Sequence, residues 1–316
     1  MKLIVNEFGA YLSKKENRFV VKTKEKEEEY SADEVEQIII SSPSSISEGV
    51  VRLATDKNID IVYTSFYGKP FARIYPCTLG GTTLTRREQA KAYFDKRGVV
   101  IVKEILKAKL KNQQFLIKRL SKTREKIFSD EILTLEDNYL KIDKIEGEKI
   151  DDIRDKLLGY EGYGASVYFQ CINKISPLVN RNPEGKDIVN MALNYGYGIL
   201  YSEVERACIL SGLDPYLGFL HMDRYGKPSM VLDMVEHFRA LVDRVIITLF
   251  VQKQLSERDI EIIGEGRLLT KEGRTKIIEA IMKMFDGKDS YKNKKLTISS
   301  IILEQGREVS YSEQRD

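Results

Sequence analysis

The sequence predicts an α+β protein with a small β-strand-rich N-terminal domain and a larger, all-α-helical C-terminal domain. Up to Pro76, short apolar or alternating runs are separated by turn residues, which is typical of strands. From Arg86 onward, apolar residues recur at three- and four-residue steps, which indicates helices. Between these regions, the run Gly80-Gly81-Thr82-Thr83 suggests a flexible joint. We therefore expect a β-rich domain at 1–76, a linker at 77–85 and an α-helical domain at 86–316.

The individual elements follow from the same patterns. Strands are expected at 2–6, 10–14, 18–22, 24–30, 37–41, 60–65 and 71–75, with one short helix at 47–57. Helices are expected at 86–96, 100–120, 151–180 (with breaks), 186–210, 229–255, 271–285 and 294–305. The tail from Arg307 is polar, as chain ends often are.

Composition and motifs exclude several classes of protein. Of the 316 residues, 31% are charged and 42% hydrophobic, which is ordinary for a globular chain. Three cysteines without a CxxC argue against a disulfide framework or a structural zinc site and suit a reducing cytoplasm. No signal peptide or membrane span is evident, so we expect a cytoplasmic protein that does not contact membranes. A P-loop, a dinucleotide fingerprint and a GxSxG elbow are also missing.

Charge is distributed unevenly although the net charge is only +3. Residues 86–126 hold fourteen Lys/Arg against four Asp/Glu, and residues 127–161 hold five against eleven. This split is consistent with a phosphate-facing surface beside an acidic pocket. Two ordinary solvated helix faces explain it equally well.

One stretch, 190–250, contains several residues whose side chains could bind a metal or take part in catalysis. It contains both histidines, His221 and His237, and two acids three residues apart on an expected helix, Asp233 and Glu236. Acids one turn apart can face a common point, where His221 could join them at a metal. Alternatively, His221 is a structural histidine and the acids favour the helix N-terminus. His237 continues an amphipathic pattern, and we interpret it as structural.

A glycine-rich run surrounds a single acid, Glu161, in the segment LLGYEGYGA at 157–165. Glycine is disfavoured inside a helix by about 1 kcal/mol relative to alanine. The run therefore indicates either close approach of a ligand or another backbone, or a loose turn at a helix N-terminus.

These segments together resemble one family, the CRISPR-associated endonuclease/integrase of the spacer-adaptation module. Three motifs match it in order: GYEG with Glu161, GFLH with His221, and SMVLDMVEHFR with Asp233 and Glu236. Supporting matches are SISEGVVRLATDKNIDIVYTSFYGKPFARIYP, NYGYGILYSEVERA and LLTKEGRTKIIEAIMKMF, so the resemblance covers nearly the whole chain.

The resemblance implies a divalent metal held by Glu161, His221 and Glu236, the expected catalytic residues. Many relatives have Asp at the third position, and Glu236 is longer by one methylene. Asp233 corresponds to a second acid near the site, with a supporting or second-metal role. Two carboxylates and one imidazole leave coordination positions open, which suits Mg²⁺ or Mn²⁺ better than a closed zinc site.

The resemblance further implies that the protein inserts spacer DNA into a CRISPR array by phosphodiester transesterification. It implies a homodimer, double-stranded DNA as substrate, and a small ferredoxin-like partner that bridges two dimers. From their positions near His221, Arg224 and Lys227 are expected to contact DNA phosphates, and the basic segment 86–126 is a second candidate. Two alternatives remain: a structure-specific nuclease of DNA repair, and a non-catalytic DNA-binding scaffold.

Overall fold

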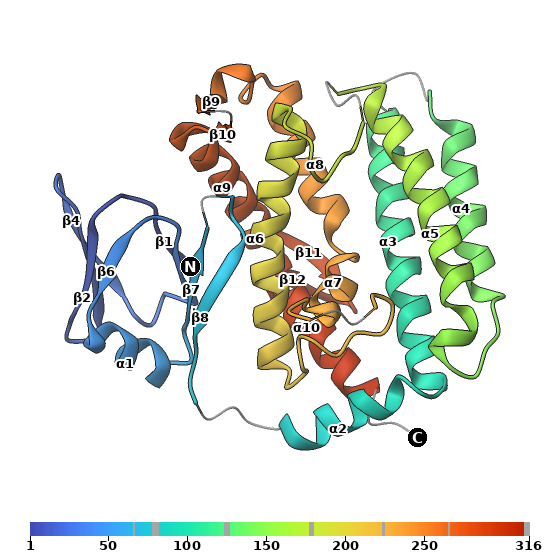
Figure 1. Ribbon diagram of the computed structural model, residues 1–316, viewed down its shortest axis with the longest axis horizontal. Helices are drawn as coiled ribbons and strands as arrows, with labels where there is room; N and C mark the ends of the chain where they lie inside the picture. The colour runs from blue at the N-terminus through green and yellow to red at the C-terminus, as the bar shows by residue number, and fades with distance from the viewer. Residues whose placement is uncertain are drawn as a thin grey trace. The chain divides into compact units, whose positions relative to one another are not determined.

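The computed structural model describes residues 1–65, 67–77, 82–122, 127–176, 180–222, 225–264 and 266–312. The chain divides into two compact units, Met1–Gly80 and Gly81–Asp316. The first is rich in strands and the second is mostly helical (Figure 1), which confirms the predicted fold class. No helix in the described ranges is both long and apolar enough to cross a membrane.

The N-terminal unit contains two four-stranded sheets and one helix. One sheet has the order β1 (Lys2–Val5), β5 (Gln37–Ile40), β7 (Asp60–Thr64) and β8 (Pro70–Ile74). The other has the order β4 (Glu27–Ser31), β3 (Arg18–Lys22), β2 (Ala10–Lys15) and β6 (Ser44–Ile46). Side chains from both sheets and from α1 (Glu48–Asp56) form one buried apolar core. The seven expected strands and the helix are present, and β6 is the strand that the sequence analysis missed.

Nine helices are described in the C-terminal unit. They are α2 (Thr82–Ala92), α3 (Lys96–Lys122), α4 (Ser129–Asp143), α5 (Ile150–Asn173), α6 (Ile188–Leu210), α7 (Ser229–Val235), α8 (Arg239–Val251), α9 (Lys271–Asp286) and α10 (Ile298–Ser312). The helices α3, α4 and α5 pack side by side, and α6 is surrounded by α7, α8, α9 and α10 (Figure 1). Helix α6 is apolar and buried along most of its length, so it forms the centre of the second group.

Three differences from the expected helices have identifiable causes. Helix α4 lies in the acidic segment, whose charges obscured its helical period.

Two hairpins interrupt the expected all-helical domain. They are β9 (Ile260–Ile263) with β10 (Gly266–Leu269), and β11 (Lys288–Tyr291) with β12 (Lys294–Thr297). In the second hairpin, Lys292 and Asn293 both have positive φ, as a two-residue type I′ turn requires. The expected helix 294–305 is therefore wrong at its start.

The third difference matters most for the site. The expected single helix 229–255 is two helices, α7 and α8, separated by Glu236, His237 and Phe238. The backbone of Glu236 is still helical, and its N–H donates to the Asp233 carbonyl, so the chain departs from the helix after Glu236, at Phe238.

Candidate active site

The carboxylate of Asp233 organises the loop that carries His221. Asp233 lies in α7 and is completely buried. Its Oδ2 accepts hydrogen bonds from the backbone N–H groups of Phe219 (2.6 Å) and Leu220 (3.0 Å). Its Oδ1 accepts one from the His221 N–H (3.0 Å) and lies 2.6 Å from Nδ1 of the His221 ring. With these four contacts, the buried carboxylate fixes both the loop and the His221 ring.

Two further side chains anchor the same loop from other helices. The buried Gln89 of α2 donates to the carbonyls of Asp214 and Leu217 and accepts from the Asp214 N–H. Arg154 of α5 donates to the carbonyl of Phe219. The sequence analysis missed both residues, because neither lies near His221 along the chain.

Glu161 lies in the middle of helix α5, so the predicted loose turn at a helix N-terminus is wrong. The described structure places no other backbone against these glycines, and only Gly164 is closely approached, by side chains. A Cβ on Gly159 or Gly162 would meet no atom within 4 Å, whereas a Cβ on Gly164 would lie 2.4 Å from Cδ2 of Leu110 on α3. Gly164 therefore allows α5 to pack closely on α3, and this packing brings Glu161 to the α3 surface.

On that surface, Lys109 of α3 joins the two acids expected to bind a metal. Its Nζ donates to Oε1 of Glu161 and lies 2.5 Å from Oε2 of Glu236. The lysine is only 8% exposed. Burial alone would lower the pKa of Lys109, but Glu236 and Glu161 together raise it above its ordinary value. Lys109 is thus a buried ammonium ion between two carboxylates, and no motif in the sequence indicated it.

Arg239 at the start of α8 holds the other oxygen of Glu236. Its Nε lies 2.8 Å from Oε1, and its Nη2 donates to the Tyr201 hydroxyl. The guanidinium also lies over the rings of Tyr197 and Tyr201, a cation–π arrangement. Burial would raise the pKa of Glu236, but chiefly the charges of Lys109 and Arg239 lower it to about 2. Glu236 is therefore ionised at neutral pH.

The expected ligands Glu161, His221 and Glu236 are thus brought to one region. Both acids contact the same ammonium, and His221 lies close enough to act electrostatically on Glu236. Because Asp233 engages Nδ1, the His221 ring has Nε2 as its other nitrogen for a ligand. In the part of the chain that the structure describes, no three His, Cys, Asp or Glu side chains lie in a metal-binding group as they stand.

The donor set suits a divalent cation. Oε2 of Glu236 is buried, and Lys109 Nζ lies 2.5 Å from it as its ion-pair partner. Two carboxylates directed at one ammonium, beside an imidazole oriented by a third carboxylate, suit Mg²⁺ or Mn²⁺. The residues fit such an ion, provided that it takes the place of the Lys109 ammonium.

Asp233 and Glu236 do not face a common point, contrary to their expected spacing on one helix. Both oxygens of Asp233 accept hydrogen bonds from the 219–221 loop, whereas Glu236 faces Lys109 and Arg239. His237 is buried, and its carbonyl accepts a hydrogen bond from Asn112 of α3. Burial lowers the pKa of His237 to about 4, so this histidine is neutral at physiological pH.

The sequence predicted phosphate contacts at Arg224, at Lys227 and in the basic segment 86–126. Lys227 lies half-buried in the loop before α7, and Arg224 lies outside the described residues. In the basic segment, several cations already contact acids: Lys91 and Arg97 pair with Glu88, Lys107 pairs with Glu104 and Asp143, and Lys118 lies near Glu136. The local charge of this segment therefore overstates the number of its cations that face solvent.

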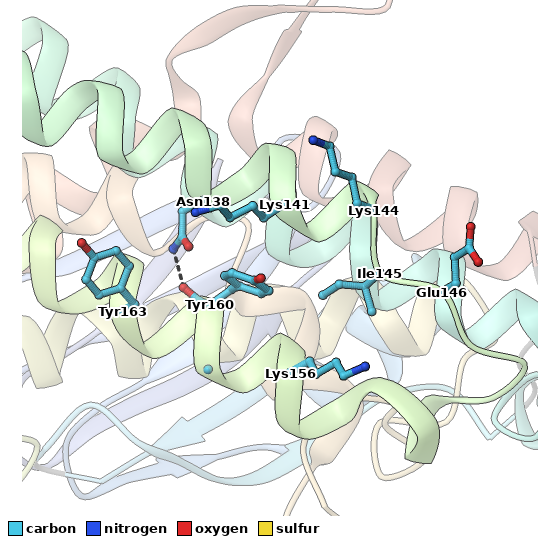
Figure 2. A pocket seen from close by; sticks show the side chains of 9 residues that line it. Asn138, Lys141, Lys144, Ile145, Glu146, Lys156, Tyr160 and Tyr163 are labelled. Carbon is cyan, nitrogen blue, oxygen red and sulfur yellow. Dashed lines mark hydrogen bonds between the residues drawn. The ribbon is translucent and has the colours of Figure 1, made fainter.

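A cavity of about 990 Å³ lies between α4, α5 and the loop that joins them. Its lining includes the exposed lysines Lys141, Lys144 and Lys156 and the rings of Tyr160 and Tyr163. Figure 2 shows these side chains and the hydrogen bond from Asn138 of α4 to the Tyr160 carbonyl of α5. Glu146 also lines the cavity, and Asp137 pairs with Lys141, so the three lysines lie among acids of the same segment.

Comparisons with known proteins agree with the geometry. Residues 3–283 match the family model described as CRISPR associated protein Cas1. The chain is 36% identical to "CRISPR-associated endonuclease Cas1 1" of Archaeoglobus fulgidus over 98% of this chain and 95% of the relative. It is 34% identical to a protein of the same name from Pyrobaculum aerophilum, over 88% of this chain and 89% of that one.

Solved structures extend the similarity to the fold. A casposase bound to its integration product superposes with a TM-score of 0.84 at 26% identity, over 100% of this chain and 91% of the casposase. A CAS1 protein from Thermotoga maritima gives a TM-score of 0.80 at 20% identity, over 100% and 97% of the two chains. With the ordered motifs, the two-unit fold and these matches in agreement, the chain belongs to the Cas1 family of CRISPR-associated proteins.

Proposed function

We propose that this protein is a divalent-metal-dependent DNA endonuclease and integrase that inserts spacer DNA into a CRISPR array. The observation that carries the proposal is the meeting of Glu161 and Glu236 at one buried cation, beside a histidine that Asp233 orients. The names of the archaeal relatives and the integration product bound to the similar casposase support nuclease and strand-transfer activity.

In this proposal, Glu161, Glu236 and His221 would hold Mg²⁺ or Mn²⁺. When bound, such an ion acts as a Lewis acid on the scissile phosphate and stabilises the departing 3′ oxygen. Arg239 donates to Oε1 of Glu236 and would hold this carboxylate in place for the ion. Asp233 acts as a positioning residue, because its oxygens hold the loop and the His221 ring. The same residues serve hydrolysis and strand transfer, since only the nucleophile, water or a DNA 3′-OH, differs.

The partners remain those that the family resemblance implies: a homodimer, double-stranded DNA from spacer precursor and repeat, and the small ferredoxin-like protein that bridges two dimers. Phosphates would be met by Lys227 and Arg224, which follow His221 in the sequence, by cations of segment 86–126, and by the lysines of the α4–α5 cavity. The Tyr160 and Tyr163 rings of that cavity offer surfaces on which an unpaired base could stack.

A strand-transfer assay tests the proposal directly. We expect the protein to join a labelled spacer precursor to a supercoiled plasmid carrying a repeat, in the presence of the small partner and Mn²⁺ or Mg²⁺. EDTA should abolish the product, and restored metal should recover it. A structure-specific repair nuclease would cleave branched DNA without joining ends, and a scaffold would bind DNA without altering it. Joining that persists undiminished in EDTA would refute the metal-dependent mechanism.

Raising the salt concentration should weaken DNA binding steeply. A protein that contacts about four phosphates loses roughly 100-fold in affinity between about 50 and 200 mM salt, because condensed counterions are released on binding. Fluorescence anisotropy of a labelled duplex at several salt concentrations measures this slope. Each lost phosphate contact should reduce the slope by about one.

Charge-removing variants of the two candidate surfaces can then be compared. Lys227→Gln removes a cation from the loop before α7, and Lys141→Gln with Lys156→Gln removes two from the α4–α5 cavity. A slope that stays the same in all of these variants would place the phosphate contacts elsewhere.

A further inference from the structure

The two carboxylates proposed to bind the metal are already neutralised by an internal cation. The Nζ of Lys109 contacts Glu161 and Glu236 at once, and Arg239 contacts Glu236 from its other side. Two negative and two positive charges therefore balance within this cluster. Without Lys109, Glu161 and Glu236 would keep only one neighbouring cation, Arg239, which contacts Glu236. Leaving a buried carboxylate without its partner is strongly destabilising.

The ammonium and a metal ion would compete for the same oxygens. Arg239 engages Oε1 of Glu236, which leaves Oε2 for a ligand, and Lys109 lies 2.5 Å from this atom. On Glu161, the Lys109 ammonium contacts Oε1. A divalent ion bound between these oxygens would meet the ammonium at contact distance, and the two like charges would repel each other. The flexible four-carbon stem of a lysine permits its head to withdraw.

We infer that Lys109 is a built-in counter-ion, which holds Glu161 and Glu236 together before metal binds and must be displaced for the metal to enter. This inference rests on the proposed metal-dependent function and assigns a positioning role to a residue outside the catalytic motifs. Metal affinity in this protein then depends on competition between the metal ion and the Lys109 ammonium, as well as on the geometry of the ligands. The displaced ammonium remains beside the site, where the DNA phosphates would approach.

The test is the effect of Lys109→Met on the metal-free and metal-loaded protein. In metal-free buffer the variant should melt roughly 10 °C lower than the wild type, because the carboxylates lose their counter-ion. Titration calorimetry should show Mn²⁺ binding at least about tenfold more tightly, because no ammonium has to leave. Mn²⁺ should accordingly raise the melting temperature of the variant more than that of the wild type. An equal or smaller increase would overturn the inference.

A second variant covers the case in which Lys109→Met does not fold. Lys109→Arg retains the cation and offers a fork that can bind both carboxylates, so it should weaken Mn²⁺ binding while preserving metal-free stability. Unchanged or tighter Mn²⁺ binding in this variant would contradict competition. Lys111→Met is the matched control, because Lys111 lies exposed on the same helix, over the Tyr139 ring. Its Mn²⁺ affinity should equal that of the wild type.

These outcomes separate the inference from the proposed function. If the wild-type protein itself binds neither Mn²⁺ nor Mg²⁺ and shows no metal-dependent increase in melting temperature, the metal-dependent function fails. If the wild type binds metal and the Lys109 variants bind it with unchanged affinity, only the role of Lys109 fails.

Discussion

Glu161→Gln and His221→Ala should each reduce DNA nicking and strand transfer by at least about 1,000-fold, while DNA binding stays close to the wild-type level. Loss of a metal ligand removes several kcal/mol of transition-state stabilisation, and each 1.36 kcal/mol corresponds to about a factor of ten in rate. Binding should persist because phosphate contacts, which dominate affinity, lie on other side chains. Single-turnover cleavage of a labelled substrate and anisotropy on the same preparations measure the two properties.

The two variants need a folding control, because Glu161 is also an ion-pair partner of Lys109. Glu161→Gln keeps the shape of the side chain but leaves Lys109 with one carboxylate instead of two. Its circular dichroism and melting temperature should therefore be compared with those of His221→Ala. Nicking that remains at the wild-type level in both variants would point to a contaminating nuclease and support the scaffold alternative. Parallel loss of folding and DNA binding in His221→Ala would place His221 in a structural role.

Asp233→Ala should destabilise the protein by about 3 kcal/mol or more and impair catalysis indirectly. The substitution leaves the N–H groups of Phe219, Leu220 and His221 without their acceptor, and each unsatisfied buried group costs about 1–3 kcal/mol. It also releases the His221 ring, and loss of such a positioning carboxylate typically costs about 10- to 100-fold in metal affinity or activity. Urea denaturation and a Mn²⁺ titration of the folded variant measure these effects.

Two comparisons show whether the losses of stability and metal affinity in Asp233→Ala come from the hydrogen bonds of its carboxylate. Asp137→Ala removes an exposed acid that pairs with Lys141, and it should change the unfolding free energy by less than about 0.5 kcal/mol. Glu236→Gln should weaken Mn²⁺ binding more than Asp233→Asn does, because Glu236 is the proposed ligand and Asp233 acts through His221. The reverse order would identify Asp233 as the direct ligand. An unfolding free energy of Asp233→Ala equal to that of the wild type would contradict the positioning role.

Local patterns in the sequence indicated much of the fold. Alternating and apolar runs located seven strands of the N-terminal unit, and helical periodicity located most of the C-terminal helices. The misplaced elements have physical explanations. Acidic residues masked the period of α4, and the turn at Lys292 and Asn293 requires a backbone conformation that helical periodicity does not reveal. The break between α7 and α8 was hidden because apolar residues continue across it.

The sequence by itself determined the family and the residues that we propose as metal ligands, because Glu161, His221 and Glu236 stand in short motifs whose order identifies that family. Only the tertiary structure decided what surrounds them. Lys109 lies 52 residues before Glu161 on a long amphipathic helix, where a lysine normally faces solvent. It is buried because Gly164 allows α5 to pack closely against α3, while the end of α7 brings Glu236 to the same face of α3. Contacts of this kind depend on which helix faces meet, and spacing along one chain does not encode that.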